Sequence, residues 1–299
     1  MLEYSLPELL AICGSVLLIT LLLMDLLDSS CILSSLDCPS SAQPGPFVYS
    51  ESGGPGTWRC TYPEANGCEQ SPINVACRSA TVLTPSDPLR WKGYAEEPVS
   101  ASIVNDGNTV VLFGFWTCPS RPTLQGGPLK GCYDFHSVVF RWGPSDHDGS
   151  EHSLDYVRYP LELQVVHTKR GVCDPKPKLK DALVIVSYFF QITSADNPYM
   201  DMVVTNLWRV SSPGAHAHVA PFPLEWLFPC FERKFYTYHG SLTYPPCSET
   251  VVWILQPETI SVSSKQVAEF RKVCSVEGPI VSNTRPVQKL HDRQIFYYA

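Results

Sequence analysis

Residues 137–143 read SVVFRWG and combine β-branched and aromatic residues with a glycine at the end. This composition is typical of a short β-strand that leads into a turn. Side chains of a strand point alternately to its two faces, so Val139 and Arg141 leave one face and Phe140 the other. The stretch therefore predicts a strand that carries a valine and a permanently charged guanidinium on the same face.

Similar short stretches recur along the chain, each bounded by Gly, Pro, Asn or Asp, and they predict a sheet of many strands. They are VSASIV (99–104), TVVLFGFW (109–116), LELQVVH (161–167), ALVIVSYFFQI (182–192), TVVWILQP (250–257) and ISV (260–262). Residues 183–192 are apolar on both faces, as expected for the middle of a covered sheet. Only residues 263–274 have helical spacing, with Ser263 or Ser264 as the N-cap.

The N-terminal residues 1–27 differ from the rest. Residues 9–27 are apolar apart from Asp25, and as a helix with a rise of about 1.5 Å per residue they nearly match a bilayer core of roughly 30 Å. We expect an uncleaved membrane anchor, and a cleaved signal peptide is the alternative. Residues 28–46 are rich in Ser and Pro and predict a linker, which places a single folded domain at 47–299.

The overall charge and the cysteines limit the partners and the compartment. A formal net charge of −7 gives no basic surface, so we expect no nucleic acid partner. All but one of the 12 cysteines follow the apolar run, which favours an oxidising, non-cytosolic compartment. The secretory pathway or cell surface is the first expectation. The absence of any N-x-S/T sequence keeps the mitochondrial inner membrane, with the domain facing the intermembrane space, as the alternative.

Five segments, in order and at matching distances, resemble the α-class carbonic anhydrases over about residues 47–297. They are EQSPINV (69–75), GSEH (149–152), RYPLELQVVH (158–167), HGSLTYPPCSETVVWIL (239–255), and FRKV (270–273) with NTRPVQKLHDRQI (283–295). The resemblance implies a single domain on a large, mostly antiparallel twisted sheet with few short helices. It also implies a cleft that reaches a zinc ion in active members.

The zinc-binding positions differ from those of active members. Zinc hydration chemistry needs three neutral imidazoles and one open position for water. The resemblance places these ligands at Val139, Arg141 and Gln164, none of which is a histidine. Valine has no lone pair, an amide oxygen is a weak donor, and a guanidinium repels a dication. We therefore expect no metal and no other cofactor.

The resemblance also assigns neighbouring positions. Thr243 and Glu151 match the hydroxyl and carboxylate that orient zinc-bound hydroxide in active members, and Asn108 stands at the position of the proton-shuttling histidine. Glu162 matches the carboxylate that orients a ligand histidine. We expect Arg141 and Glu162 to form a buried pair in place of the metal charge, and Tyr244 to narrow the cleft.

Cysteine and histidine pairs complete the candidate sites. Cys68 and Cys247 match a disulfide of extracytoplasmic members of the family, and Cys118 with Cys132 is a further expected pair across a Pro/Gly-rich turn. His216 and His218, in a Gly/Pro-flanked segment expected to be a loop, form a metal site only if His239 lies nearby. We expect that it does not.

These substitutions predict that the chain is not an enzyme. The expected function is that of a catalytically inactive, membrane-tethered carbonic-anhydrase-related protein that acts as an interaction or scaffold module, as in an accessory subunit of a membrane complex. Its partner is a protein of unknown identity. The alternatives are a residual or rebuilt carbonate dehydratase (CO2 hydration) activity and small-anion binding in the emptied cleft.

Overall fold

The computed structural model describes residues 47–299 except 51, 85–86, 118–119 and 173–178. The expected anchor at 9–27 and the linker at 28–46 lie outside the described residues. Within the described part, no helix is long and apolar enough to cross a membrane. The boundaries expected for anchor, linker and domain stay predictions.

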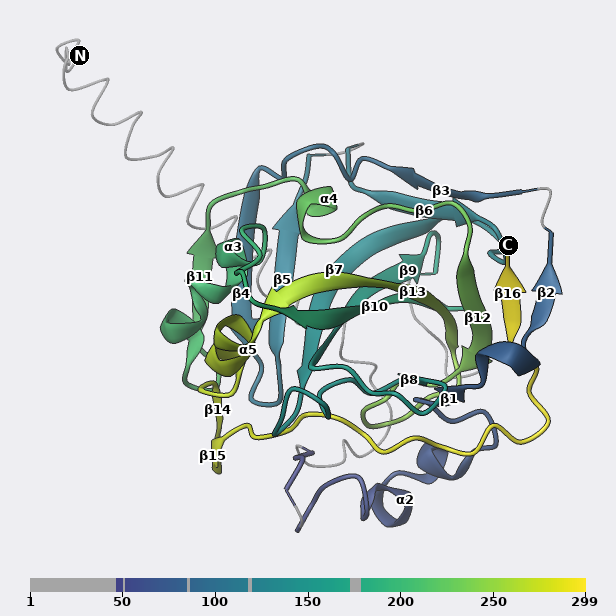
Figure 1. Ribbon diagram of the computed structural model, residues 1–299, viewed down its shortest axis with the longest axis horizontal. Coiled ribbons are helices and arrows are strands. Elements are labelled where there is room, and N and C mark those ends of the chain that lie inside the picture. The colour runs from purple at the N-terminus through teal and green to yellow at the C-terminus, as the bar shows by residue number, and fades with distance from the viewer. Residues whose placement is uncertain (1–46, 51, 85–86, 118–119, 173–178) are drawn as a thin grey trace, which may run out of the picture. The chain divides into compact units, whose positions relative to one another are not determined.

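A sheet of 12 strands, counted over the described residues, dominates the fold (Figure 1). Its main path runs β11 (His216–Val219), β4 (Ser100–Asn105), β5 (Val110–Phe115), β7 (Tyr133–Trp142), β9 (Leu161–Lys169), β10 (Leu183–Thr193), β13 (Val251–Ser263), β12 (Phe235–Gly240), β16 (Phe296–Tyr298) and β2 (Thr81–Leu83). β6 (Thr123–Gly126) pairs with both β3 (Leu89–Lys92) and β7.

Most strand pairs of this sheet are antiparallel, and the exceptions among the described strands are β10 with β13 and β16 with β2. Two small two-stranded pairings complete the strands: β1 (Asn74–Val75) with β8 (Ser153–Leu154), and β14 (Cys274–Ser275) with β15 (Gly278–Pro279). The mostly antiparallel sheet matches the expectation from the sequence.

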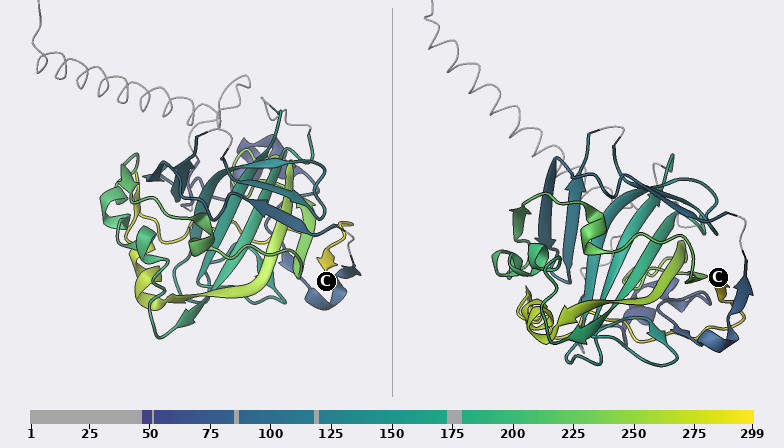
Figure 2. Two further views of the ribbon diagram at one scale, coloured as in Figure 1. Left: turned by 90° about the horizontal axis from the view of Figure 1, so that it is seen from above. Right: turned by 45° about the horizontal axis from the view of Figure 1, so that its top comes forward.

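The helices are few and short, as expected. They are α2 (Trp58–Thr61), α3 (Asp201–Val204), α4 (Leu224–Leu227), α5 (Ser264–Phe270), and the 3-10 turns η1 (Pro63–Asn66), η2 (Cys77–Ser79) and η3 (Leu207–Val210). α3 and α5 lie beside the β11 end of the sheet, while β16 and β2 form the opposite end (Figures 1 and 2).

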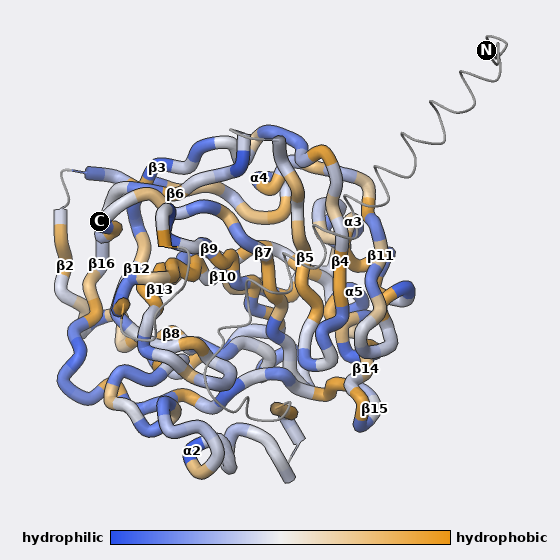
Figure 3. Tube along the Cα trace, turned by 180° about the vertical axis from the view of Figure 1, so that it is seen from behind, coloured by the Kyte–Doolittle hydropathy of each residue, from blue (hydrophilic) through white to orange (hydrophobic). Residues whose placement is uncertain are grey.

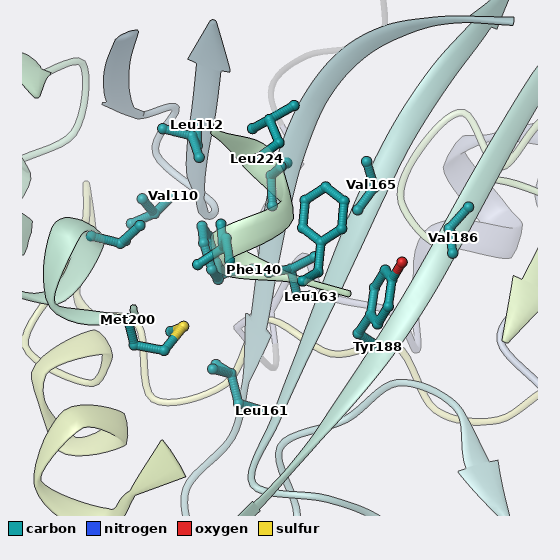
Figure 4. Packing of buried hydrophobic residues seen from close by; sticks show 14 of the residues in the cluster. Val110, Leu112, Phe140, Leu161, Leu163, Val165, Val186, Tyr188, Met200 and Leu224 are labelled. Atoms are coloured by element: carbon teal, nitrogen blue, oxygen red, sulfur yellow. The ribbon is translucent and has the colours of Figure 1, made fainter. Parts of the chain in front are cut away.

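The sequence of β10 explains why the sheet has two covered faces. Val184, Val186 and Tyr188 pack into one buried cluster, and Ile185 and Phe189 into another. Figure 4 shows the first cluster, in which Leu224 of α4 and Met200 lie over the strands. Hydrophobic residues accordingly follow the strands in Figure 3. The strand order and the alternation thus fix which face of β7 and β9 each candidate side chain occupies.

Two predicted elements took a different form. The stretches expected as separate strands at 250–257 and 260–262 form one continuous strand, β13. The expected loop around His216 is the edge strand β11, because its alternate residues Ala217 and Val219 are buried against the core. The helix at the predicted place begins with a capping box between Ser263 and Gln266, which confirms the N-cap, and ends at Phe270.

Candidate functional site

Strand pairing brings the three expected zinc-ligand positions together. Val139 of β7 lies directly across from Gln164 of β9, and Arg141 lies across from Glu162. All four residues are buried. Their side chains share the sheet face opposite to Phe140 and Leu163, which belong to the first core cluster. The base of the candidate site is therefore built on two neighbouring strands, as the sequence predicts.

Arg141 is the charged centre of this base, with 2% of its surface exposed. Its Nε lies 3.3 Å from Oε2 of Glu151 and 3.4 Å from Oε1 of Gln164. Its Nη1 donates to the hydroxyl of Tyr49 at 2.9 Å and to the carbonyl of Asn283 at 3.3 Å. The guanidinium is thus held from four sides by acceptors that stabilise its charge.

The acidic partner of Arg141 is Glu151, so the expectation of a pair with Glu162 is wrong. Burial alone would lower the pKa of Arg141, but the Glu151 carboxylate, with Tyr49 and Tyr244, raises it above its usual value. The guanidinium therefore keeps its charge at any pH at which the protein folds.

Glu162 is not available to Arg141 because other donors already use both of its oxygens. Its Oε2 accepts the backbone N–H groups of Glu151 at 2.8 Å and His152 at 2.9 Å. Its Oε1 accepts Ser187 Oγ at 2.6 Å, Gln164 Nε2 at 3.0 Å and His152 Nδ1 at 2.9 Å. Burial alone would raise the pKa of Glu162, but His152 and these hydrogen bonds lower it to about 2.

Glu151 contacts Gln164 and Arg141 instead of Thr243, the partner that the family resemblance implies. Its Oε2 accepts Gln164 Nε2 at 2.8 Å, beside the Arg141 guanidinium, and its Oε1 accepts the backbone N–H of Arg285 at 3.0 Å. Thr243 Oγ1 is buried and has no hydrogen-bond partner among the described residues. The expected hydroxyl–carboxylate pair is therefore not hydrogen-bonded, since Gln164 and Arg141 take that side of the carboxylate.

The donor chemistry of the three positions does not fit zinc. Val139 offers no lone pair, Arg141 is a cation, and the Gln164 oxygen already faces Arg141. A dication here would lie against the guanidinium and be repelled. Elsewhere in the described part of the chain, no cluster of three His, Cys, Asp or Glu side chains could hold a metal.

Aromatic residues cover the guanidinium. The Tyr244 ring centroid lies 5.5 Å from the guanidinium carbon of Arg141, within cation–π range. Phe47 stacks on Tyr244 at 6.0 Å and contacts Trp58 edge-on at 5.6 Å. The expectation that Tyr244 narrows the cleft stays a prediction. Tyr49 and Asn283 were not among the residues expected at this site, because neither lies on a predicted strand and neither residue type signals a charged partner.

The position expected for the proton shuttle lies in the tight turn between β4 and β5. The backbone N–H of Asn108 donates to Asp106 Oδ1 at 2.8 Å, and its carbonyl accepts Asn283 Nδ2 at 3.3 Å. An amide side chain does not exchange protons near neutral pH. The geometry here gives Asn108 a role in the turn.

The expected disulfide between Cys68 and Cys247 is not present in the structure. Cys68 is an exposed free thiol, and Cys247 is a buried free thiol packed with Trp58 and Tyr62. Burial raises the pKa of Cys247 to about 11, and the thiolate is the form that reacts to make a disulfide. Cys132 is also free, and its expected partner Cys118 lies outside the described residues.

His216 and His218 lie on β11 with ring centroids 6.5 Å apart, and both are exposed. His239 lies on β12, several strands away across the sheet. The three histidines therefore do not form one metal site, as expected.

Comparison with known proteins identifies the relatives of this chain. The family model described as eukaryotic-type carbonic anhydrase matches residues 53–299. Carbonic anhydrase 3 of Sus scrofa is 35% identical over 254 residues, which cover 82% of this chain and 95% of the relative. Carbonic anhydrase 7 of Homo sapiens is 34% identical over 255 residues, covering 83% and 95%.

These relatives contradict one prediction. Carbonic anhydrase 3 of Homo sapiens is also similar, at 32% identity over 254 residues, 83% of this chain and 96% of the relative. All three relatives are named as enzymes, and they match over nearly their whole length. The prediction that the chain is not an enzyme is therefore wrong by this comparison. It rested on three side chains, whereas the similarity extends over the whole domain.

Proposed function

The chain belongs to the eukaryotic-type carbonic anhydrase family, and on this premise we propose that it binds a protein partner through its surface. The proposal includes a membrane tether at residues 9–27 and a domain in a non-cytosolic compartment, as the apolar run and the cysteine content support. In this proposal the Arg141–Glu151 pair stabilises the cleft base, and the recognition of partners falls to exposed residues elsewhere.

Three exposed aromatic side chains carry this proposal. Trp208, on η3, is 74% exposed. Tyr199, two residues before α3, is 50% exposed, and Trp226, on α4, is 47% exposed. Large aromatic side chains are costly to leave in water and dominate the binding energy of protein interfaces. Such residues in exposed positions are typical of interaction surfaces.

A second candidate is the hydration of CO2, which the comparisons favour more directly than protein binding. The relatives are named carbonic anhydrases, and Glu151 and Thr243 match family positions. Because the side chains at the zinc-ligand positions do not fit the metal, this activity needs a rebuilt site. Small-anion binding belongs with this candidate, because the Thr243 hydroxyl has no hydrogen-bond partner among the described residues and the Arg141 guanidinium is positively charged.

Two measurements on the full-length chain in mild detergent separate the candidates. Native affinity capture followed by mass spectrometry is expected to recover one stoichiometric protein partner, whose identity also reports the compartment. Stopped-flow CO2 hydration, with Arg141→Ala as the comparison, tests the second candidate. A hydration rate proportional to protein concentration, together with no captured partner, would overturn the protein-binding proposal in favour of the enzyme.

A further inference from the structure

A groove of about 460 Å³ lies between α4, the segment just before α3, and β13. Its walls include the rings of Tyr199 and Trp226, the prolines Pro198 and Pro229, and Ile260. The two aromatic rings have centroids 6.2 Å apart at an angle of 50°. The groove is open to solvent rather than enclosed, and most of its lining residues are apolar.

The backbone on both sides of this groove is held by hydrogen bonds and buried side chains. Asn197 accepts the backbone N–H of Tyr199 at 3.0 Å and donates to the carbonyl of Ser261 at 2.9 Å. On the other side, Leu224 and Leu227 anchor α4 in the core. The backbone that carries the two rings is therefore held in place before any partner arrives, which reduces the entropy lost on binding.

One charged residue lines the groove. Glu225 is exposed and precedes Trp226 on α4. Among the described residues it forms no ion pair. A basic side chain of a partner would complement this carboxylate, and the net charge of −7 also favours a basic partner.

We propose that this groove binds an extended, proline-containing segment of a partner protein, with a Lys or Arg of that segment beside Glu225. The inference rests on the proposed protein-binding function and names its surface. Extended proline-rich segments dock into aromatic-lined grooves because they are already ordered before binding. A sugar would also stack on the two rings, so maltohexaose is included in the test as the competing ligand.

The test uses two fluorescent peptides, Pro-Pro-Lys-Pro-Pro-Lys-Pro-Pro and the same peptide with Glu in place of Lys. Fluorescence anisotropy with the full-length chain in mild detergent is expected to show saturable binding of the Lys peptide. Trp226→Ala and Tyr199→Ala should each raise its Kd at least tenfold. Tyr156→Ala is the matched control, since this tyrosine is 84% exposed and lies outside the groove, and it should leave the Kd within twofold.

A charge reversal makes the test specific. Glu225→Lys is expected to reverse the preference, so that the Glu peptide binds more tightly than the Lys peptide. Circular dichroism and thermal midpoints confirm that each variant folds. The proposal is overturned if wild-type chain does not bind the Lys peptide, if Trp226→Ala binds it as tightly as wild type, or if maltohexaose binds in its place.

Affinity capture with Trp226→Ala separates this proposal from the proposed function. Loss of the captured partner supports the groove. Capture of the same partner at the wild-type level places the interface elsewhere and overturns the groove, while protein binding itself stands. Failure of wild type to capture any partner overturns the proposed function, and the peptide titration still decides whether the groove binds such segments.

Discussion

Arg141 Nε lies 3.3 Å from Glu151 Oε2, and both side chains are almost completely removed from solvent. The pair joins strand β7 to the segment that follows it, at the point where the family places a zinc ligand. Removing one partner of a buried pair leaves the other charge uncompensated. This relationship gives the first prediction.

Arg141→Gln is expected to lower the free energy of unfolding by about 3–5 kcal/mol, because Glu151 stays buried without its cation. Lys272→Gln is the matched control. It breaks the Lys272–Glu269 pair of 2.6 Å, which is largely exposed, and should cost less than about 1 kcal/mol. Urea denaturation measures both values. Equal losses in the two variants would show that Arg141 is not a structural cation.

The Thr243 hydroxyl has no hydrogen-bond partner among the described residues, and this gives a second prediction. Thr243→Val should change the free energy of unfolding by less than about 1 kcal/mol, since no hydrogen bond is lost. Ser187→Ala removes the 2.6 Å bond to the Glu162 carboxylate and should cost about 1.5–3 kcal/mol. Thermal and urea unfolding compare the two. A larger loss for Thr243→Val than for Ser187→Ala would mean that the hydroxyl has a partner.

The buried His167 makes the free energy of unfolding depend on pH. The ring is buried, Nδ1 donates to the Val184 carbonyl at 3.3 Å, and Nε2 accepts from the Tyr94 hydroxyl at 2.6 Å. Burial lowers the pKa of His167 from its ordinary 6.5 to about 3. The unfolded chain therefore binds a proton first, so this contribution is complete above pH 6.5 and is lost as pH falls toward 3.

Between pH 6.5 and 4.5 the expected loss from this group is about 2 kcal/mol, because half of the unfolded chains already carry the proton at pH 6.5 and the slope approaches about 1.4 kcal/mol per pH unit only below it. Urea denaturation at several pH values measures it. His167→Gln should remove this contribution and leave that of His136, whose pKa burial also lowers, to about 4, whereas His147→Gln, at an exposed position, should keep the whole slope. An unchanged slope in His167→Gln would contradict the assignment.

Restoring the three imidazoles should create a zinc site. Val139 faces Gln164 across two paired strands, and Arg141 shares the face of Val139. The triple variant Val139→His, Arg141→His, Gln164→His is expected to bind one zinc per chain, measured by elemental analysis after dialysis. The double variant that keeps Arg141 should not, because the guanidinium remains. Zinc in the double variant would show that charge repulsion is not decisive.

The free thiols predict an order of chemical labelling. Iodoacetamide should modify the exposed Cys68 well before the buried Cys247, whose raised pKa of about 11 also keeps it protonated. Peptide mass spectrometry under native conditions measures the two rates. If both residues resist labelling until a reductant is added, the two cysteines form a disulfide and the description of them as free thiols is wrong.

The sequence predicted those parts of the fold that depend on local periodicity. The predicted runs at 137–143 and 182–192 largely coincide with parts of β7 and β10, and Ser263 caps α5, because alternation and capping are encoded in neighbouring residues. The family resemblance, rather than local periodicity, placed Val139 and Gln164 at one site, and the pairing of β7 with β9 brings them together.

The partner of Arg141 was not predictable in this way. Glu151 and Tyr49 reach the guanidinium from segments outside β7 and β9, and sequence spacing does not specify that approach. The choice of Glu151 over Glu162 depends on backbone N–H groups of residues 151 and 152, which already occupy the Glu162 carboxylate. Likewise, the groove at Trp226 depends on three segments that meet only in the fold.

Anomalous diffraction at the zinc absorption edge, from wild-type crystals soaked in a zinc salt, tests most directly whether the Arg141–Glu151 pair takes the place of the metal. The expected map has no anomalous peak beside the side chains of Val139, Arg141 and Gln164. A peak there with ligand distances of about 2.0–2.2 Å would contradict this account of the cleft base.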